Sequence, residues 1–178
     1  MTSSPYTFQV TIDAAQPHVL ADWWAQALGW TVEPQDADFI RSMLAQGFAT
    51  EAEITEHRGA LVWATGAAIN HPDGAAPRLL FNQVPEAKTV KNRVHLDLRS
   101  AAPATGEELD RLTALGATRV GEGRQGPHQW VVLADPEGNE FCVAVAELSS
   151  RPGPHPAGDY PRSCATASAN PSLGPRDR

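Results

Sequence analysis

The sequence has few cysteines, no long apolar run and no excess of basic side chains. Cys142 lies in an apolar segment and Cys164 in a proline-rich one, so we expect two reduced thiols rather than a disulfide. The net charge of -7 argues against a protein that binds the phosphate backbone of nucleic acid. Neither a signal peptide nor about 18 consecutive apolar residues occurs, which predicts a cytoplasmic protein without membrane contact.

Large apolar side chains are also scarce after residue 148. Residues 149–178 hold six of the 15 prolines. Such a segment buries too little apolar surface to offset the entropy of ordering it. We therefore expect a disordered Pro-rich tail over 149–178 and one folded domain over 6–148, which is long enough to bury a core without disulfides.

The folded part repeats one plan. Residues 6–14 alternate as a strand does, and a helix is predicted from Pro17 to a stop at Gly29. The second half has an alternating stretch at 92–98 and a helix at 106–115 that ends before Gly116. The number of residues from Gln9 to His95 equals the number from Pro17 to Pro103, so these pairs occupy equivalent positions in the two copies.

Three further strands follow each helix. They are predicted at 31–34, 60–69 and 78–84 in the first copy, and at 117–123, 128–135 and 139–146 in the second. The segment 37–57 interrupts the first copy. Phe39, Ile40, Met43 and Leu44 have helical spacing, and Thr50 begins a second short turn, so the insertion is predicted to be helical and peripheral.

The motifs "WWAQALGW", "NRVHLDL" and "DPEGNEFCV" occur in this order. Together with the duplication, they resemble the vicinal oxygen chelate superfamily, and within it the glyoxalase-like domain group with its glyoxalase/bleomycin resistance/dioxygenase fold. The resemblance implies an α+β fold of two tandem βαβββ modules, over about 6–84 and 92–148. Their mixed sheets would curl around a cupped cavity.

The stretch "NRVHLDL" is the strongest indication of a site. Arg93, His95, Asp97 and Arg99 share one face of the predicted strand, whereas Val94, Leu96 and Leu98 share the other and should pack under the second helix. The polar row could face solvent, as in many antiparallel sheets. We favour a row that faces the cup.

Metal-dependent members of the superfamily take ligands from both modules, on the first and last strands. The resemblance places these positions at Gln9, His95 and Cys142, and at or near Leu80, which has no donor atom. Gln9, His95 and Cys142 could hold zinc. We favour the alternative, a His95 that binds no divalent metal and is hydrogen-bonded within the cavity.

The other candidate residues have two interpretations each. Asp97 could orient His95 or act as a base with it. Arg93 and Arg99 could bind a substrate carboxylate or pair with acidic side chains. Trp63 and Trp130 could stack on a flat ligand or belong to the core. Cys142 could contact the ligand, although a small buried residue is the expected role.

Three functions fit these features. The first is a metal-dependent glyoxalase-type lyase or isomerase, or a dioxygenase-type enzyme. The second is a non-catalytic protein that sequesters a drug or metabolite, as in the bleomycin-resistance branch. The third is a metal-free enzyme in which His95 and Asp97 transfer protons. All three predict a small-molecule ligand, and the pattern is compatible with a homodimer or a monomer.

Overall fold

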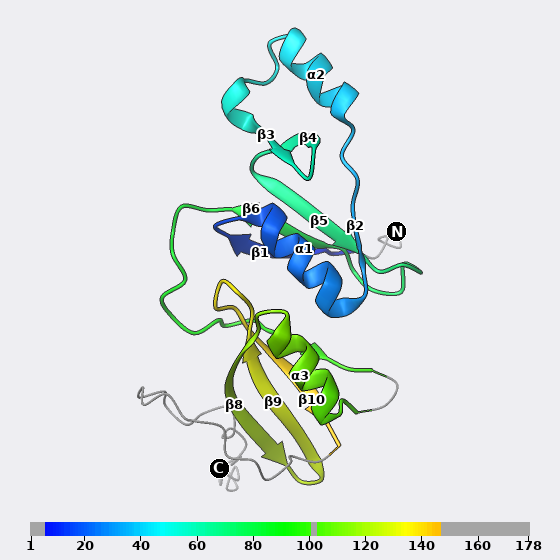
Figure 1. Ribbon diagram of the computed structural model, residues 1–178, viewed down its shortest axis with the longest axis vertical. Helices are drawn as coiled ribbons and strands as arrows, with labels where there is room; N and C mark the ends of the chain where they lie inside the picture. Colours follow the sequence, from blue (N-terminus) through cyan, green and yellow to red (C-terminus); the bar gives the residue numbers. More distant parts are fainter. Residues whose placement is uncertain (1–5, 101–102, 147–178) are drawn as a thin grey trace, which may run out of the picture.

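The computed structural model describes residues 6–100 and 103–146. Its elements, in chain order (Figure 1), are β1 Val10–Ala14, α1 Pro17–Leu28, β2 Thr31–Val32, α2 Ala37–Ala45, the 3-10 turn η1 Glu51–Glu53, β3 Ile54–His57, β4 Ala60–Trp63, β5 Gly66–Asn70, β6 Leu79–Gln83, β7 Leu96–Leu98, α3 Gly106–Ala114, β8 Thr118–Gln125, β9 His128–Ala134 and β10 Glu140–Val145. The predicted tail lies outside the described residues.

The two predicted modules are confirmed by two sheets of identical strand order. The first sheet runs β1-β6-β5-β2 and the second runs β7-β10-β9-β8. In each, the first strand is parallel to the last strand, and the other pairs are antiparallel. Thr11 pairs with Leu80 in the first sheet, as Asp97 pairs with Cys142 in the second. The structure therefore places Leu80 where the second module has Cys142.

Helix α1 joins the modules. Pro17 begins it and Gly29 ends it with a φ of 68°, a left-handed conformation that glycine adopts without steric cost. Trp23 and Trp24 on this helix are buried and meet the ring of Phe141, on β10, edge-on at centroid distances of 5.9 and 5.0 Å. One apolar core therefore runs through both modules.

The "DPEGN" turn of the second module adds polar contacts across this interface. Both carboxylate oxygens of Glu137 accept backbone hydrogen bonds at the start of α1, from Ala15 (2.6 Å) and Gln16 (2.9 Å). Glu137 thus supplies the cap that Gln16, at the N-cap position, does not supply with its own side chain. Trp24 Nε1 donates to the buried carboxylate of Asp135 at 3.0 Å.

The insertion forms a small separate unit at one end of the molecule (Figure 1). Two of its parts are helical as predicted: Asp36 caps α2, and Thr50 and Glu53 form a capping box at η1. Its last four residues are not helical, because they form strand β3 and pair with β4. The single strand predicted over 60–69 is wrong, because β4 pairs with β3 whereas β5 joins the first sheet. The side chain of Gln35 holds the break, since it accepts from Trp63 N–H and donates to the Gly66 carbonyl.

One further prediction about packing is wrong. Val94 is 79% exposed and does not pack under α3 as Leu96 and Leu98 do. The reason is that β7 pairs with β10 only from Leu96 onward, so Val94 precedes the part of the strand that is held in the sheet. Among the described helices, none is long and apolar enough to cross a membrane.

Candidate functional site

The second sheet has one covered face and one open face. Leu98, Val143 and Leu133 belong to the core cluster that includes Leu112 of α3. The residues that alternate with them on β7, β10 and β9 point the other way. There, Asp97, Cys142 and Trp130 line a cavity of about 900 Å³. Arg99, Gln125 and His128 contribute to the same cavity, which we call the cup; it is lined by the second module alone, whereas the predicted cup was shared by the sheets of both modules.

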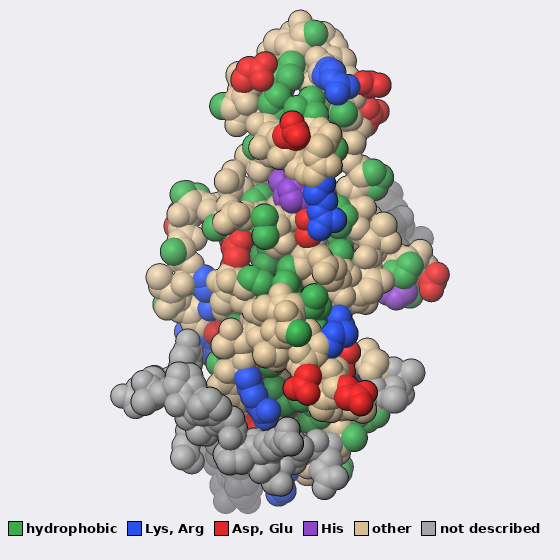
Figure 2. Space-filling model, in the orientation of Figure 1, with side chains coloured by type: hydrophobic (Ala, Val, Ile, Leu, Met, Phe, Trp, Pro, Cys, Tyr) green, Lys and Arg blue, Asp and Glu red, His purple; other side chains and the backbone are tan. Residues whose placement is uncertain are grey.

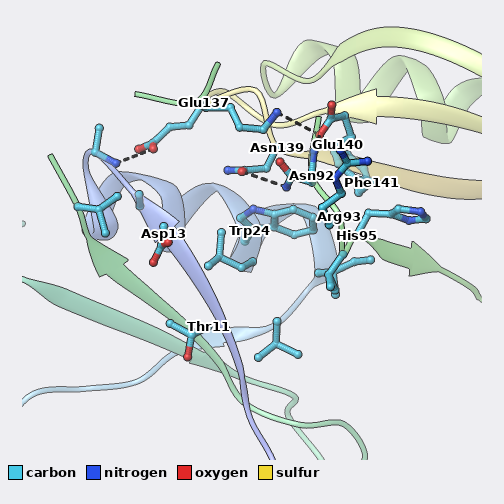
Figure 3. A pocket seen from close by; sticks show the side chains of 18 of the residues that line it. Thr11, Asp13, Trp24, Asn92, Arg93, His95, Glu137, Asn139, Glu140 and Phe141 are labelled. Atoms are coloured by element: carbon cyan, nitrogen blue, oxygen red, sulfur yellow. Dashed lines mark hydrogen bonds and ion pairs between the residues drawn. The ribbon is translucent and has the colours of Figure 1, made fainter. Parts of the chain in front are cut away.

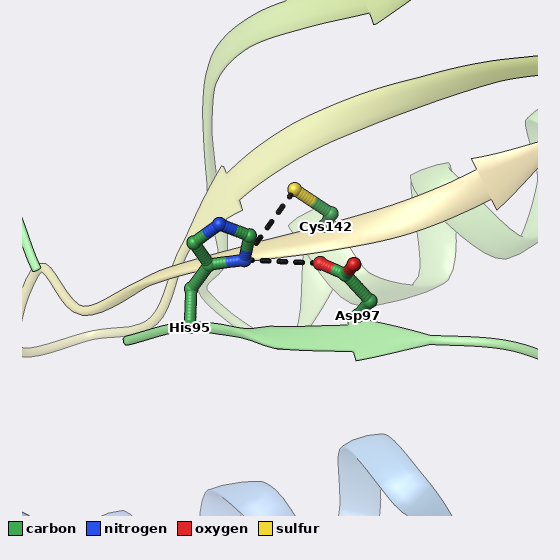
Figure 4. Close-up of side chains that lie close together, drawn as sticks. All are labelled: His95, Asp97 and Cys142. Atoms are coloured by element: carbon green, nitrogen blue, oxygen red, sulfur yellow. Dashed lines mark hydrogen bonds and ion pairs between the residues drawn. The ribbon is translucent and has the colours of Figure 1, made fainter. Parts of the chain in front are cut away.

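Three side chains meet in the cup. His95 Nδ1 lies 2.9 Å from Asp97 Oδ1 and 3.9 Å from Cys142 Sγ (Figure 4). Strand pairing explains the arrangement, because Asp97 and Cys142 are direct neighbours on β7 and β10 and His95 precedes Asp97 by two residues on the same side. The sequence pattern predicted that His95 and Asp97 share a face. It did not show that they touch.

The contact with Asp97 sets the state of the imidazole. A carboxylate only accepts hydrogen bonds, so Nδ1 of the neutral ring carries the hydrogen and Nε2 keeps a free lone pair. In Figure 4, Nε2 lies on the side of the ring away from Asp97. The His95 side chain is 33% exposed and the Asp97 side chain 53%, so the ring is accessible to a small molecule.

Trp130 forms part of the cup wall and rests on a glycine. A Cβ atom added to Gly123 would lie only 2.3–2.5 Å from three atoms of the indole ring. Gly123 pairs with Trp130 across β8 and β9, and Gly121 pairs with Val132 beside them. The ring therefore lies close against the β8 backbone, and its outer surface is left for a ligand. The signal in the sequence was the Gly-Glu-Gly stretch, whose role depends on strand register.

A second cavity, of about 870 Å³, lies between the modules and is lined by β1 and by the residues before β7. Figure 3 shows Thr11 and Asp13 on one side of it and Arg93 and His95 on the other. His95 lines both cavities. It therefore stands at the boundary between the cup and the cleft that separates the modules.

The linker between the modules, residues 85–91, is anchored at the edge of this cleft. Glu140 accepts a hydrogen bond from Asn92 N–H at 3.0 Å and forms an ion pair with Lys88 at 3.2 Å. Burial opposes ionisation of Glu140, but these donors hold its pKa below the ordinary value. The ion pair of Lys88 therefore holds the linker in place.

Figure 2 shows acidic and basic side chains interspersed over one face of the molecule.

The structure does not bring every predicted site residue to the cup. Arg99 and Trp130 line it, whereas Arg93 lines the cleft between the modules. Trp63 lies on β4, which pairs with β3 at the end of the insertion, and Gln9 lies beside Arg78; neither lines either cavity. Trp63 is displaced because the hairpin β3–β4 carries it away from the first sheet.

A metal held by both modules does not fit the side chains present. The Gln9 carbonyl oxygen accepts from Arg78 Nη1 at 2.8 Å, and Arg78 is in turn fixed by Glu33 at 2.7 and 3.0 Å. This hydrogen bonding holds the Glu33 pKa below its usual value. Leu80 has no donor atom. At the two positions that the family pattern assigns to it, the first module therefore offers an amide already bound to Arg78 and an apolar side chain, whereas the described part of the second module holds three ligand types close together.

Comparison with known proteins agrees with this architecture. The family model described as "Glyoxalase-like domain" matches residues 9–144. The chain belongs to the glyoxalase-like domain family. A glyoxalase family protein from Bacillus cereus has the same fold, with a TM-score of 0.50 and 14% identity over 81% of this chain and 95% of that one.

Other solved structures are similar at lower scores. A glyoxalase/bleomycin resistance protein/dioxygenase family enzyme from Burkholderia phytofirmans has a TM-score of 0.46 at 15% identity, over 78% of this chain and 97% of that one. A bleomycin resistance determinant encoded on transposon Tn5 has a TM-score of 0.45 at 12% identity, over 81% and 100%. A dephospho-CoA kinase from Gloeobacter violaceus is 32% identical over 80 residues, 44% of this chain but 38% of the kinase.

Proposed function

We propose that this glyoxalase-like protein binds a small organic molecule in the cup and transfers a proton to or from it through His95. The observation that carries the proposal is the 2.9 Å contact between His95 Nδ1 and Asp97 Oδ1. It fixes the tautomer in which Nε2 is a proton acceptor. Proton transfer at a carbon next to a carbonyl, as in a lyase or isomerase, is the reaction class that such a base serves.

The walls of the cup support an organic ligand with a planar part. Trp130 presents a ring surface that a flat group can cover, and Ala144, its direct partner on β10, also lines the cup. Arg99, on the cup wall, can bind an anionic group of the same molecule.

The test is deuterium exchange. Small ketones and thioesters with acidic C–H groups are incubated with the full chain in D2O, and loss of the C–H signal is followed by proton NMR. We expect exchange that falls by about 10²–10⁴-fold in a His95→Gln variant. Asp97→Asn should lower it less, because the ring stays but its tautomer is no longer fixed. Exchange that is unchanged in His95→Gln refutes the proposed base.

Sequestration without chemistry is the second candidate function. The observation that favours it is that the small side chains of Cys142 and Ala144 line the cup beside Trp130. Ligand-observed NMR separates the two functions. A sequestering protein would bind planar compounds with an affinity that depends on Trp130. The bound compound would not react, and His95→Gln would leave the affinity unchanged.

We also propose that two chains form a homodimer. Among the described strands, β1 and β7 are both sheet edges that face the cleft between the modules, and edge strands are available for pairing with another chain. Light scattering after size-exclusion chromatography should give twice the chain mass of 19.1 kDa. A single species at the monomer mass contradicts this part of the proposal.

A further inference from the structure

We propose that the ligand of the cup is an aromatic carboxylic acid with a single negative charge, whose carboxylate binds Arg99 while its ring covers Trp130. This ligand class rests on the proposed function, since His95 would act on the same molecule. Two observations carry it. One is the position of Arg99 relative to Trp130, and the other is the charge of the side chains around Arg99.

Strand register places Arg99 and Trp130 on either side of one small side chain. Ala144 on β10 pairs with Trp130 on β9. On the other side of β10, Leu98 at the end of β7 pairs with Val143, so Arg99, the next residue, comes level with Ala144. Arg99, Ala144 and Trp130 all line the cup. Since neighbouring strands lie about 4.8 Å apart, the backbones of Arg99 and Trp130 are about 10 Å apart, with only a methyl group between them.

The proposed base lies beside this row. Asp97 pairs with Cys142, two residues before Ala144 on β10, so Asp97 is about 7 Å along the strands from the row. His95 is held next to Asp97 by their 2.9 Å contact. The side chains of Arg99 and Trp130 fill part of the span between their strands. A single ring with a short acidic chain is therefore enough to reach both, and the carbon between ring and carboxylate then lies on the side of His95.

Arg99 carries a charge that its surroundings leave available. Within the described part of the chain, no acidic side chain forms an ion pair with Arg99, although Asp97 precedes it by two residues on the same side. The reason is that Asp97 holds His95 instead. A guanidinium group matches the two oxygens of a carboxylate with two parallel hydrogen bonds.

Asp97 also limits the charge of the ligand. Apart from the histidines, Asp97 and Arg99 are the charged side chains among the described residues that line the cup. A ligand with one negative charge is balanced by Arg99. A phosphate ester, with about two negative charges at neutral pH, would meet one cation and a nearby carboxylate, so we infer a carboxylate rather than a phosphate.

The test compares ligands of the same shape. Benzoylacetate has an aromatic ketone, an acidic CH2 group and a carboxylate, and benzoylacetamide replaces the carboxylate with a neutral amide. Dissociation constants for the full chain are measured by ligand-observed NMR at pH 7. We expect benzoylacetate to bind about tenfold more tightly than the amide, because its hydrogen bonds with Arg99 are charge-assisted. Phenacyl phosphate, the dianionic counterpart, should bind more weakly than benzoylacetate.

Two arginine variants locate the effect. Arg99→Gln should bind the acid and the amide equally, because the cup has lost its guanidinium group. Arg124→Gln is the matched control, since Arg124 lies on β8 of the same module and does not line the cup. It loses the same charge and should keep the preference for the acid. Trp130→Leu should weaken both ligands alike. Circular dichroism checks that each variant folds.

The ligand class is overturned if wild type binds neither compound or binds both equally. It is also overturned if the preference persists in Arg99→Gln or is lost in Arg124→Gln, or if the phosphate binds more tightly than the acid. His95→Gln separates this result from the proposed base, because it should keep the preference while deuterium exchange falls. A preference that holds without His95-dependent exchange refutes the base alone, and exchange without the preference refutes the ligand class alone.

Discussion

Replacing Gly123 with alanine tests how the cup is shaped. The added methyl group would lie 2.3 Å from the Trp130 ring, and ordinary contact begins at 3.4 Å, so the indole must move by about 1 Å toward the cup. Overpacking of this kind costs about 1–3 kcal/mol. Alanine also favours a strand over glycine by about 0.5–1 kcal/mol, and the two effects have to be separated.

Gly121→Ala provides the matched control. Gly121 lies two residues earlier on β8, faces the same side, and has no atom within 4 Å of an added Cβ. It should therefore show the strand effect without the clash. We expect Gly123→Ala to be less stable than Gly121→Ala by about 1–3 kcal/mol in urea denaturation followed by circular dichroism.

The same pair of variants tests the role of Trp130 in binding. Movement of the ring into the cup should weaken binding of planar compounds in Gly123→Ala and leave it unchanged in Gly121→Ala, as measured by ligand-observed NMR. If the two variants agree within about 0.5 kcal/mol in stability and bind alike, Trp130 does not rest on β8 as described.

Three further predictions concern the framework. Burial raises the pKa of Asp135, so removing its charge could be expected to stabilise the fold. Asp135→Asn should nevertheless lower the free energy of unfolding by about 1–3 kcal/mol, because an amide NH2 would face the Trp24 N–H. A variant as stable as wild type contradicts this. Glu137→Ala should lose about 1 kcal/mol as α1 loses its cap, and Glu137→Gln less, by urea denaturation. Arg78 lowers the folded-state pKa of Glu33, so the Arg78–Glu33 pair stabilises the fold above the ordinary Glu pKa of 4.5, and this stabilisation is lost as pH falls through the folded-state pKa. Arg78→Met should therefore be less stable than wild type at pH 7, and the difference should shrink at pH 3.

The duplication could be predicted from the sequence because local signals define it. Pro17 and Gly29 bound the first helix, and alternating apolar residues mark the strands of both copies. The break in the strand predicted over 60–69 could not be seen, because Gln35, some 30 residues away, makes the hydrogen bonds that hold it. The same break explains why Trp63 and Trp130, which look alike in sequence, have different surroundings.

The candidate site was predictable only in part. The period of a strand places His95 and Asp97 on one face, and the family pattern points to Cys142. Their contact requires the register between β7 and β10, and the contact of Gly123 with Trp130 requires the register between β8 and β9. The first pairing joins residues far apart in the chain, and the second contains a register shift between Arg119 and Gly121, so a single sequence specifies neither.

The most direct test of the account is the tautomer of His95 in solution. Long-range ¹H–¹⁵N correlation spectra of the metal-free chain, assigned with His95→Gln, distinguish a ring protonated at Nδ1 from one protonated at Nε2. We predict the Nδ1–H form for the neutral ring, and loss of that preference in Asp97→Asn. A His95 ring that carries its hydrogen on Nε2, with no response to Asp97→Asn, would contradict the arrangement from which the proposed function follows.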